Sequence, residues 1–244
     1  MHRWAIILII LIGSLFSCSS PHPLPLTLSA CNIKKISPID FLSNKIYKKL
    51  ELDIIYETSC KPNLEAIAFL CSQIQRYCKK ESIKISQTEI SIADIVSRTV
   101  TDQKYFSSLP LIFGIWQPGH LAAFTQNFSQ KFTHGETLVL HIIYVPGIAL
   151  DQPIAIGEAF ASDSFVIFRP RIQAKWERSI LLHEFGHLVG LTDNHSTHSD
   201  KDHSFHCSNK NCVMFWCVDG EQLQEQFDDD CLQDLYASGA KKFY

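Results

Sequence analysis

Two histidines and a glutamate lie close together in the sequence His183-Glu184-Phe185-Gly186-His187. On a helix, side chains four residues apart share a face, so both imidazoles can reach one metal ion. Zinc is typical of such a pair, with each ring nitrogen about 2.0–2.1 Å from the ion. A carboxylate between the histidines can take a proton from a metal-bound water. The pattern predicts a catalytic Zn²⁺ site with His183 and His187 as ligands and Glu184 as general base.

The residues that follow predict how the site is completed. Gly190 has no Cβ, so it can take the left-handed conformation that ends a helix and turns the chain back. This turn would bring Asp193 to the metal as third ligand and leave one position for water. His195, two residues further on, is the alternative third ligand.

A segment rich in histidine follows the predicted site, with His195, His198, His203 and His206 before Cys207. We interpret it as a polar surface loop. The alternatives are a second metal site, or a segment that itself supplies the third zinc ligand.

These residues together resemble the metzincin pattern H-E-x-x-H-x-x-G-x-x-H/D, with Asp193 in the last position. Met214 resembles the methionine of the Met-turn, at about 212–216, which in metzincins forms an apolar floor beneath the zinc. The spacing C-x4-C-x-M at Cys207, Cys212 and Met214 is similar to the archaemetzincin signature, in which a second, structural zinc is bound. In archaemetzincins a histidine directly before the first cysteine is the third ligand, and a C-x-x-C pair ends the pattern. This sequence departs from both features, because Asp193 takes the ligand position about a dozen residues before Cys207, and the C-x-x-C pair is absent.

The cysteines are expected to form disulfides. The sequence has nine, and if Cys18 is lipidated an even number remains in an exported chain. An oxidising compartment favours two disulfides over a second, four-thiolate zinc site for the four cysteines nearest the C-terminus, Cys207, Cys212, Cys217 and Cys231.

Elements with α and β periodicity alternate along the chain, which indicates an α/β (α+β) domain with one mixed sheet. Strands are expected at about 50–56, 82–92, 137–145 and 157–168, and helices at about 62–77, 93–106, 171–189 and 221–237. The run 137–145 lacks alternation, as in a strand buried on both faces, so we interpret His141 as a sheet histidine. The metzincin resemblance implies a mixed twisted sheet and a smaller C-terminal subdomain, here disulfide-rich, that ends in a helix. It also implies that an edge strand around 155–168 binds the substrate as an added strand.

The N-terminus is expected to direct export. A basic start is followed by an apolar run over residues 5–12, too short to span a bilayer comfortably. Leu15-Phe16-Ser17-Cys18 resembles a bacterial lipobox, whose cysteine is lipidated. We therefore expect a signal peptide at 1–17, a lipid-anchored linker at 18–30 and a peptidase domain at 31–244, in the periplasm or at the cell surface, or secreted if Cys18 is not lipidated.

These features predict an exported zinc metallopeptidase, with a peptide or protein substrate, that is a monomer held at the membrane by a lipid anchor. The net charge of −3 and the lack of a basic run argue against nucleic acid as a partner. Aspartate as a ligand would blunt the Lewis acidity of zinc, so modest activity is expected. The alternative is a non-catalytic zinc-binding or zinc-scavenging lipoprotein.

Overall fold

The computed structural model describes residues 35–91, 93–94, 114–169, 174–192, 196–217 and 223–241. The expected signal peptide, the linker and most of the helix expected at 93–106 lie outside these ranges. No helix among the described residues is both long and apolar enough to cross a membrane.

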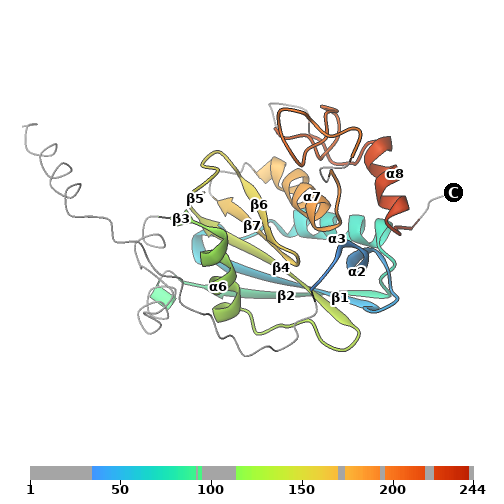
Figure 1. Ribbon diagram of the computed structural model, residues 1–244. Helices are drawn as coiled ribbons and strands as arrows, with labels where there is room; N and C mark the ends of the chain where they lie inside the picture. Colours follow the sequence, from blue (N-terminus) through green and yellow to red (C-terminus); the bar gives the residue numbers. More distant parts are fainter. Residues whose placement is uncertain are drawn as a thin grey trace, which may run out of the picture. The chain divides into compact units, whose positions relative to one another are not determined.

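The main sheet has five strands in the order β2-β1-β4-β7-β6 (Figure 1). The strands are β1 Lys49–Glu57, β2 Ser82–Ile90, β4 Thr137–Pro146, β6 Gly157–Ala161 and β7 Ser164–Arg169. All neighbours are parallel except β6, which runs antiparallel to β7. The expected mixed α/β sheet is confirmed. The run expected as one strand at 157–168 is a hairpin, and β6 forms the edge of the sheet.

Helices cover both faces of this sheet. Helices α3 (Leu64–Tyr77) and α7 (Glu177–Leu188) pack on one face, and α6 (Pro118–Phe128) packs on the other (Figure 1). Neighbouring residues of β4 therefore enter different cores: Ile142 packs with the α7 side and Ile143 with the α6 side. This alternation explains why β4 is apolar along its whole length, since both of its faces are buried.

Shorter elements complete the domain: α2 Pro38–Leu42, the 3₁₀ turns η1 Thr58–Cys60 and η2 Ala174–Trp176, a two-stranded sheet of β3 Ile115–Trp116 and β5 Ile148–Ala149, and α8 Asp229–Ala237. The helix expected at 221–237 begins only at Asp229. Asp228 is its N-cap, and the Asp228 side chain accepts a hydrogen bond from the Cys231 backbone N–H. Likewise α7 begins at Glu177, after a 3₁₀ turn, rather than near residue 171.

Two buried polar groups stabilise the fold. His141 is buried within β4, as expected, and its Nδ1 donates to Asp53 Oδ2 at 3.1 Å. Ser129 Oγ donates to the same carboxylate oxygen at 2.7 Å. Elsewhere, the Lys80 ammonium is buried and donates to three backbone carbonyl oxygens, those of Asp40, Ser43 and Tyr47, at 2.5–2.7 Å.

Candidate metal centre and catalytic site

Helix α7 is held in place at its N-terminus by a buried carboxylate. Glu177 forms an ion pair with Arg169, which ends β7. Glu177 Oε1 also accepts hydrogen bonds at 2.9 Å from the Tyr144 hydroxyl and from the Asn63 backbone N–H. These contacts tie α7 to the sheet and to the start of α3, so the residues one and two turns later have a fixed position.

His183 and His187 point their Nε2 atoms at one another, 3.1 Å apart. Two ligands of a tetrahedral zinc at about 2.05 Å are separated by about 3.3 Å. The outer nitrogen of His183, Nδ1, donates to the Val213 carbonyl oxygen at 2.7 Å, which leaves the lone pair on Nε2. A backbone partner of this kind fixes the tautomer and orientation of metal-binding histidines. The pair therefore has the geometry of two imidazoles that share an ion.

A third imidazole joins them from the loop after α7. Ligand-capable nitrogens of His183, His187 and His206 all lie within 4.8 Å of one another. The His206 ring lies 5.2 Å from that of His183 and 5.5 Å from that of His187, centre to centre. His206 Nδ1 donates to the Ser204 carbonyl oxygen at 2.8 Å, so its Nε2 is also free to bind a metal. Asp193 and His195, expected as the third ligand, lie outside the described residues.

The loop that carries His206 is anchored beneath the end of α7. Gly190 has φ +81°, as expected for a residue that turns the chain, and Thr192 follows with φ +55°. The Thr192 side chain is fully buried and donates to the carbonyl oxygen of Phe205. Because Phe205 directly precedes His206, this contact positions the third ring.

The three rings are in the protonation state that binds metal. Burial lowers the pKa of His183 to about 4 and lowers those of His187 and His206. Mutual repulsion between the rings acts in the same direction. All three are therefore neutral near pH 7, and neutral imidazole is the form that coordinates zinc.

Glu184 follows His183 directly on α7 and is almost fully buried. Burial raises the pKa of its carboxyl to about 8, and the charge of Glu158 acts in the same direction, whereas a hydrogen bond from the Ala159 backbone N–H lowers it. Strand β6 comes close to this carboxylate at Gly157. A Cβ added to Gly157 would lie only 2.5 Å from Glu184 Oε1. The general base expected from sequence thus lies between the helix and the open edge of the sheet.

Met214 lies directly against α7. It is fully buried, and a Cβ added to Gly186 would lie 2.3 Å from its Sδ atom. Gly186 is in the turn between the two histidines, so the sulfur packs against the helix where the rings leave it. The role of Met214 as a Met-turn residue stays a prediction.

A second cluster of ligand-type residues lies next to the first along the chain. Ligand atoms of Cys207, Cys212, Asp228 and Cys231 all lie within 4.8 Å of one another. The sulfurs of Cys212 and Cys231 are 3.6 Å apart, compared with about 2.0 Å in a disulfide and about 3.8 Å for two thiolates on a tetrahedral zinc. The two disulfides expected among these cysteines are not formed in the structure. Cys207, Cys212 and Cys231 are free thiols, and Cys217 is not part of the cluster.

Cys212 is the most acidic thiol of this cluster. Hydrogen bonding with Cys207 and Cys231 lowers the pKa of Cys212 to about 4, and the Asp228 and Met214 backbone N–H groups contribute at 3.4 Å each. The pKa of Cys207 is raised mainly by its hydrogen bond with Cys212, and that of Cys231 by its hydrogen bonds with Cys207 and then Cys212. A preformed thiolate with thiols and a carboxylate around it suits a soft divalent cation such as zinc.

His198 and His203, the other described histidines of the segment, have structural partners. His198 Nε2 lies 3.0 Å from Asp234 Oδ2, on α8. His203 stacks on Trp216, with ring centres 4.0 Å apart and nearly parallel planes. Among the described residues, His206 is the member of this segment that reaches the α7 histidines.

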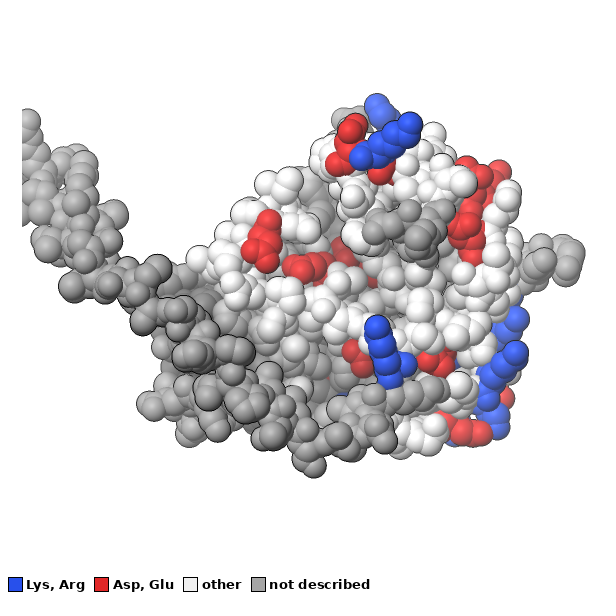
Figure 2. All heavy atoms as spheres, in the orientation of Figure 1, with Lys and Arg blue, Asp and Glu red and all other residues white. Residues whose placement is uncertain are grey.

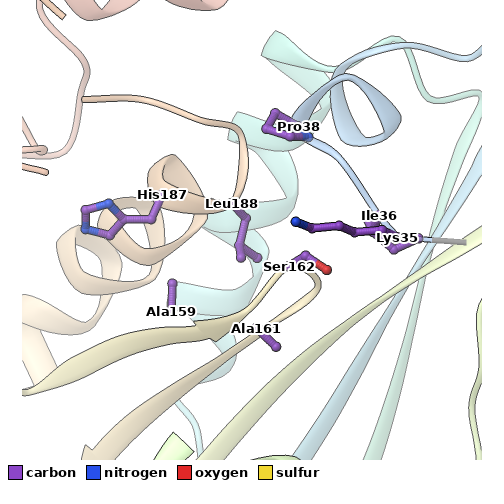
Figure 3. Close-up of a pocket in the computed structure, with 8 residues that line it drawn as sticks. All are labelled: Lys35, Ile36, Pro38, Ala159, Ala161, Ser162, His187 and Leu188. Atoms are coloured by element: carbon purple, nitrogen blue, oxygen red, sulfur yellow. The ribbon is translucent and has the colours of Figure 1, made fainter. Parts of the chain in front are cut away.

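A cavity of about 280 Å³ has His187, one of the three histidines, among its lining residues (Figure 3). One wall is the end of β6 with the turn after it, and another is the end of α7, with His187 and Leu188. Lys35 and Ile36, which precede α2, form the outer wall. Elsewhere, Figure 2 shows charged side chains in small groups on the visible face of the described residues, and some of these groups contain both acidic and basic residues.

No protein-family model matches the sequence, and no curated protein matches it. Among solved structures, the archaemetzincin of Methanopyrus kandleri is similar, with 15% sequence identity, a TM-score of 0.49, and an alignment that covers 78% of this chain and 96% of that one. At this level of similarity, what the site can do has to follow from its own residues and distances.

The sequence analysis did not predict His206 or Asp228 as ligands, although the sequence carries a pattern for each. His206 directly precedes Cys207, which is the order of the archaemetzincin signature, but the fixed spacing after Gly190 favoured Asp193. Asp228 and Cys231 keep the spacing of the terminal C-x-x-C pair, with aspartate in the first position.

Proposed function

We propose that this chain is a zinc-dependent peptidase of metzincin type, with His183, His187 and His206 as the ligands of the catalytic ion. The observation that carries the proposal is the burial of Glu184 beside three convergent imidazoles. A carboxylate that is 5% exposed, with one backbone N–H as its hydrogen-bond donor, is costly unless the site uses it. A zinc-storage protein would not need it.

The fit of the site to zinc supports the same reading. The Nε2 separation of 3.1 Å suits two ligands of one ion, and His183 and His206 each have their other ring nitrogen bound to a backbone carbonyl. When bound, zinc supplies Lewis acidity and lowers the pKa of a coordinated water towards 7. Three neutral imidazoles would leave the full charge of the ion, without the blunting that an Asp193 ligand would cause.

The residues of the chain then have defined roles. A peptide laid along the free edge of β6 would present its carbonyl beside Glu184, because Gly157 and Ala159 both approach this carboxylate. Glu184 takes a proton from the attacking water and passes it to the leaving amine. For this step Glu184 must be ionised. Its burial opposes ionisation, but a cation held by the adjacent rings would favour the charged carboxylate.

The test is cleavage of a diverse peptide mixture, with products identified by mass spectrometry, by the wild type and by Glu184→Gln. We expect the variant to bind zinc as the wild type does and to lose hydrolysis by a factor of at least about 10². Glu65→Gln, at an exposed position of α3, is the matched control and should cut normally. If neither wild type nor Glu184→Gln cuts any peptide while both bind zinc, the non-catalytic zinc-binding alternative is the better account.

A second, structural zinc at Cys207, Cys212, Asp228 and Cys231 is part of the proposal. The 3.6 Å separation of two sulfurs and the low pKa of Cys212 support it. We expect two zinc ions per chain by elemental analysis and one in Cys212→Ser. The control is Cys71→Ser, on α3. A Cys212→Ser protein that still holds two ions would contradict this second site.

Export, lipidation at Cys18, attachment to the membrane and the monomeric state are proposed from the sequence alone, as is the lack of a nucleic-acid partner. A lipid-modified Cys18 would be found by mass spectrometry of the mature N-terminus. A mature protein that begins after Cys18 would instead indicate free secretion.

A further inference from the structure

The cavity beside the catalytic rings has one cationic wall and otherwise small or apolar ones. Ala159, Ala161 and Ser162 line it from β6 and the turn that follows, and their small side chains leave the space open. Ile36 and Leu188 contribute apolar surface. The cavity is next to the candidate metal site, because His187 is also one of its lining residues.

Lys35 is the only side chain of fixed charge among the residues that line this cavity. Figure 3 shows it extending towards Leu188, with Ser162 beside it. Lys35 is exposed, and no ion pair joins it to another described residue. The nearest acidic residue along the hairpin, Asp163, accepts a hydrogen bond from Ser164 Oγ at 2.9 Å and does not line the cavity. The ammonium group is therefore available to a ligand.

The position of the cavity along β6 relates it to the cleaved bond. Ala159 donates its N–H to Glu184, and Ala161 lies two residues further along the strand. At about 3.3 Å per residue, the Ala161 end of the cavity is about 7 Å along the edge from Ala159, the residue that binds Glu184. A peptide paired antiparallel to β6, the slightly more stable arrangement, would place residues on the N-terminal side of its cleaved bond here.

The opposite end of β6 carries charge of the other sign. Glu158 follows Gly157 at the start of the strand, and it is close enough to Asp151 for the two carboxylates to repel. The edge is thus cationic at the Lys35 end and anionic at the Glu158 end. A free α-amino group at the Lys35 end would meet a like charge, whereas a carboxylate would meet an opposite one.

We propose that this cavity is a substrate subsite that takes an acidic side chain, Asp or Glu, two or three residues before the cleaved bond of an internal peptide segment, with Lys35 as the residue that selects it. This inference rests on the proposed peptidase function. It makes the protein an endopeptidase with a preference for acid on the N-terminal side, because the same lysine disfavours a free N-terminus there.

The experiment compares cleavage of matched peptides by the wild type, Lys35→Glu and Lys61→Glu. Each peptide derives from one that the wild type cuts, and carries Glu, Gln or Lys at each of the three positions before the cleaved bond. We expect kcat/KM for the Glu peptide to exceed that for the Gln peptide by about fivefold at one of these positions, the scale of a partly exposed ion pair. Lys61→Glu makes the same charge change at an exposed lysine outside the cavity and should keep the preference.

Reversal of the preference in Lys35→Glu, with the Lys peptide now cut best, would establish the assignment, since a merely damaged fold would slow all peptides together. Equal cleavage of Glu, Gln and Lys peptides by the wild type would refute the subsite and leave the peptidase function intact. The same conclusion follows if Lys35→Glu keeps the wild-type preference. A wild type that cuts no peptide in the starting mixture overturns both proposals.

Discussion

Replacement of His206 by alanine tests the ligand set most directly. In the structure this ring completes a group of three whose nitrogens lie within 4.8 Å of one another, and Asp193 is its rival from the sequence pattern. The informative comparison is therefore His206→Ala beside Asp193→Ala, in otherwise identical protein. His203→Ala is the matched control, because His203 belongs to the same segment but stacks on Trp216.

The size of the effect follows from the number of ligands. Zinc sites with four protein ligands bind with about 10–16 kcal/mol, or about 2.5–4 kcal/mol per ligand. Loss of the His206 imidazole should thus weaken zinc binding at the histidine site by roughly 100- to 1,000-fold. Asp193→Ala and His203→Ala should each change the affinity by less than about threefold, because neither removes a ligand in this assignment.

Cobalt substitution provides the assay, since the two clusters give different spectra. Thiolate-to-cobalt charge-transfer bands report on the cysteine cluster, and the weaker ligand-field bands of the histidine site can be followed separately. Competition with a chelator of known affinity then gives the dissociation constant for each variant. The assignment of His206 is refuted if Asp193→Ala loses the ion and His206→Ala keeps it.

Three further predictions concern the fold around the site. Lys80→Met should lower the free energy of unfolding by about 3 kcal/mol in urea titrations, because three carbonyls lose their buried donor; a change below about 1 kcal/mol would contradict this role. Burial opposes ionisation of Asp53, but hydrogen bonds from His141, Ser129 and Ser86 bring its pKa below the usual value. The ionised carboxylate therefore contributes its full stabilisation of the fold above about pH 4, and this contribution is lost as the pH falls further. Asp53→Asn should therefore show a shallower acid decline in stability than the wild type, and an equally steep decline would count against this pair. Gly186→Ala should destabilise by about 1–3 kcal/mol because of the contact with Met214, and by less when Met214→Ala is already present.

The parts that sequence predicted well depend on local spacing. His183, Glu184 and His187 follow from helical periodicity, and the buried strand β4 follows from an apolar run without alternation. Their neighbours along the chain decide their positions, so a sequence pattern is sufficient.

The parts of the site and fold that the sequence did not predict depend on contacts that loops make with distant segments of the chain. His206 reaches the site because Thr192 holds Phe205, a contact across the histidine-rich loop that no periodicity reports. Asp228 joins the cysteines because it is the N-cap of α8, so that the helix begins later than the predicted position 221. The hairpin between β6 and β7 was read as one strand because its short turn, at Ser162 and Asp163, hardly interrupts the β-prone run.

The adjacency of His206 and Cys207 has a consequence for how the site is assembled. The loop between Thr192 and Cys207 is held at one end by the Thr192 contact and at the other by the cysteine cluster. The entropy cost of closing this loop is therefore incurred before a catalytic ion binds. Filling the cysteine cluster would thus raise the effective concentration of the third imidazole at the α7 pair. The two metal-binding groups are then thermodynamically linked, and by reciprocity occupancy of either one should tighten the other.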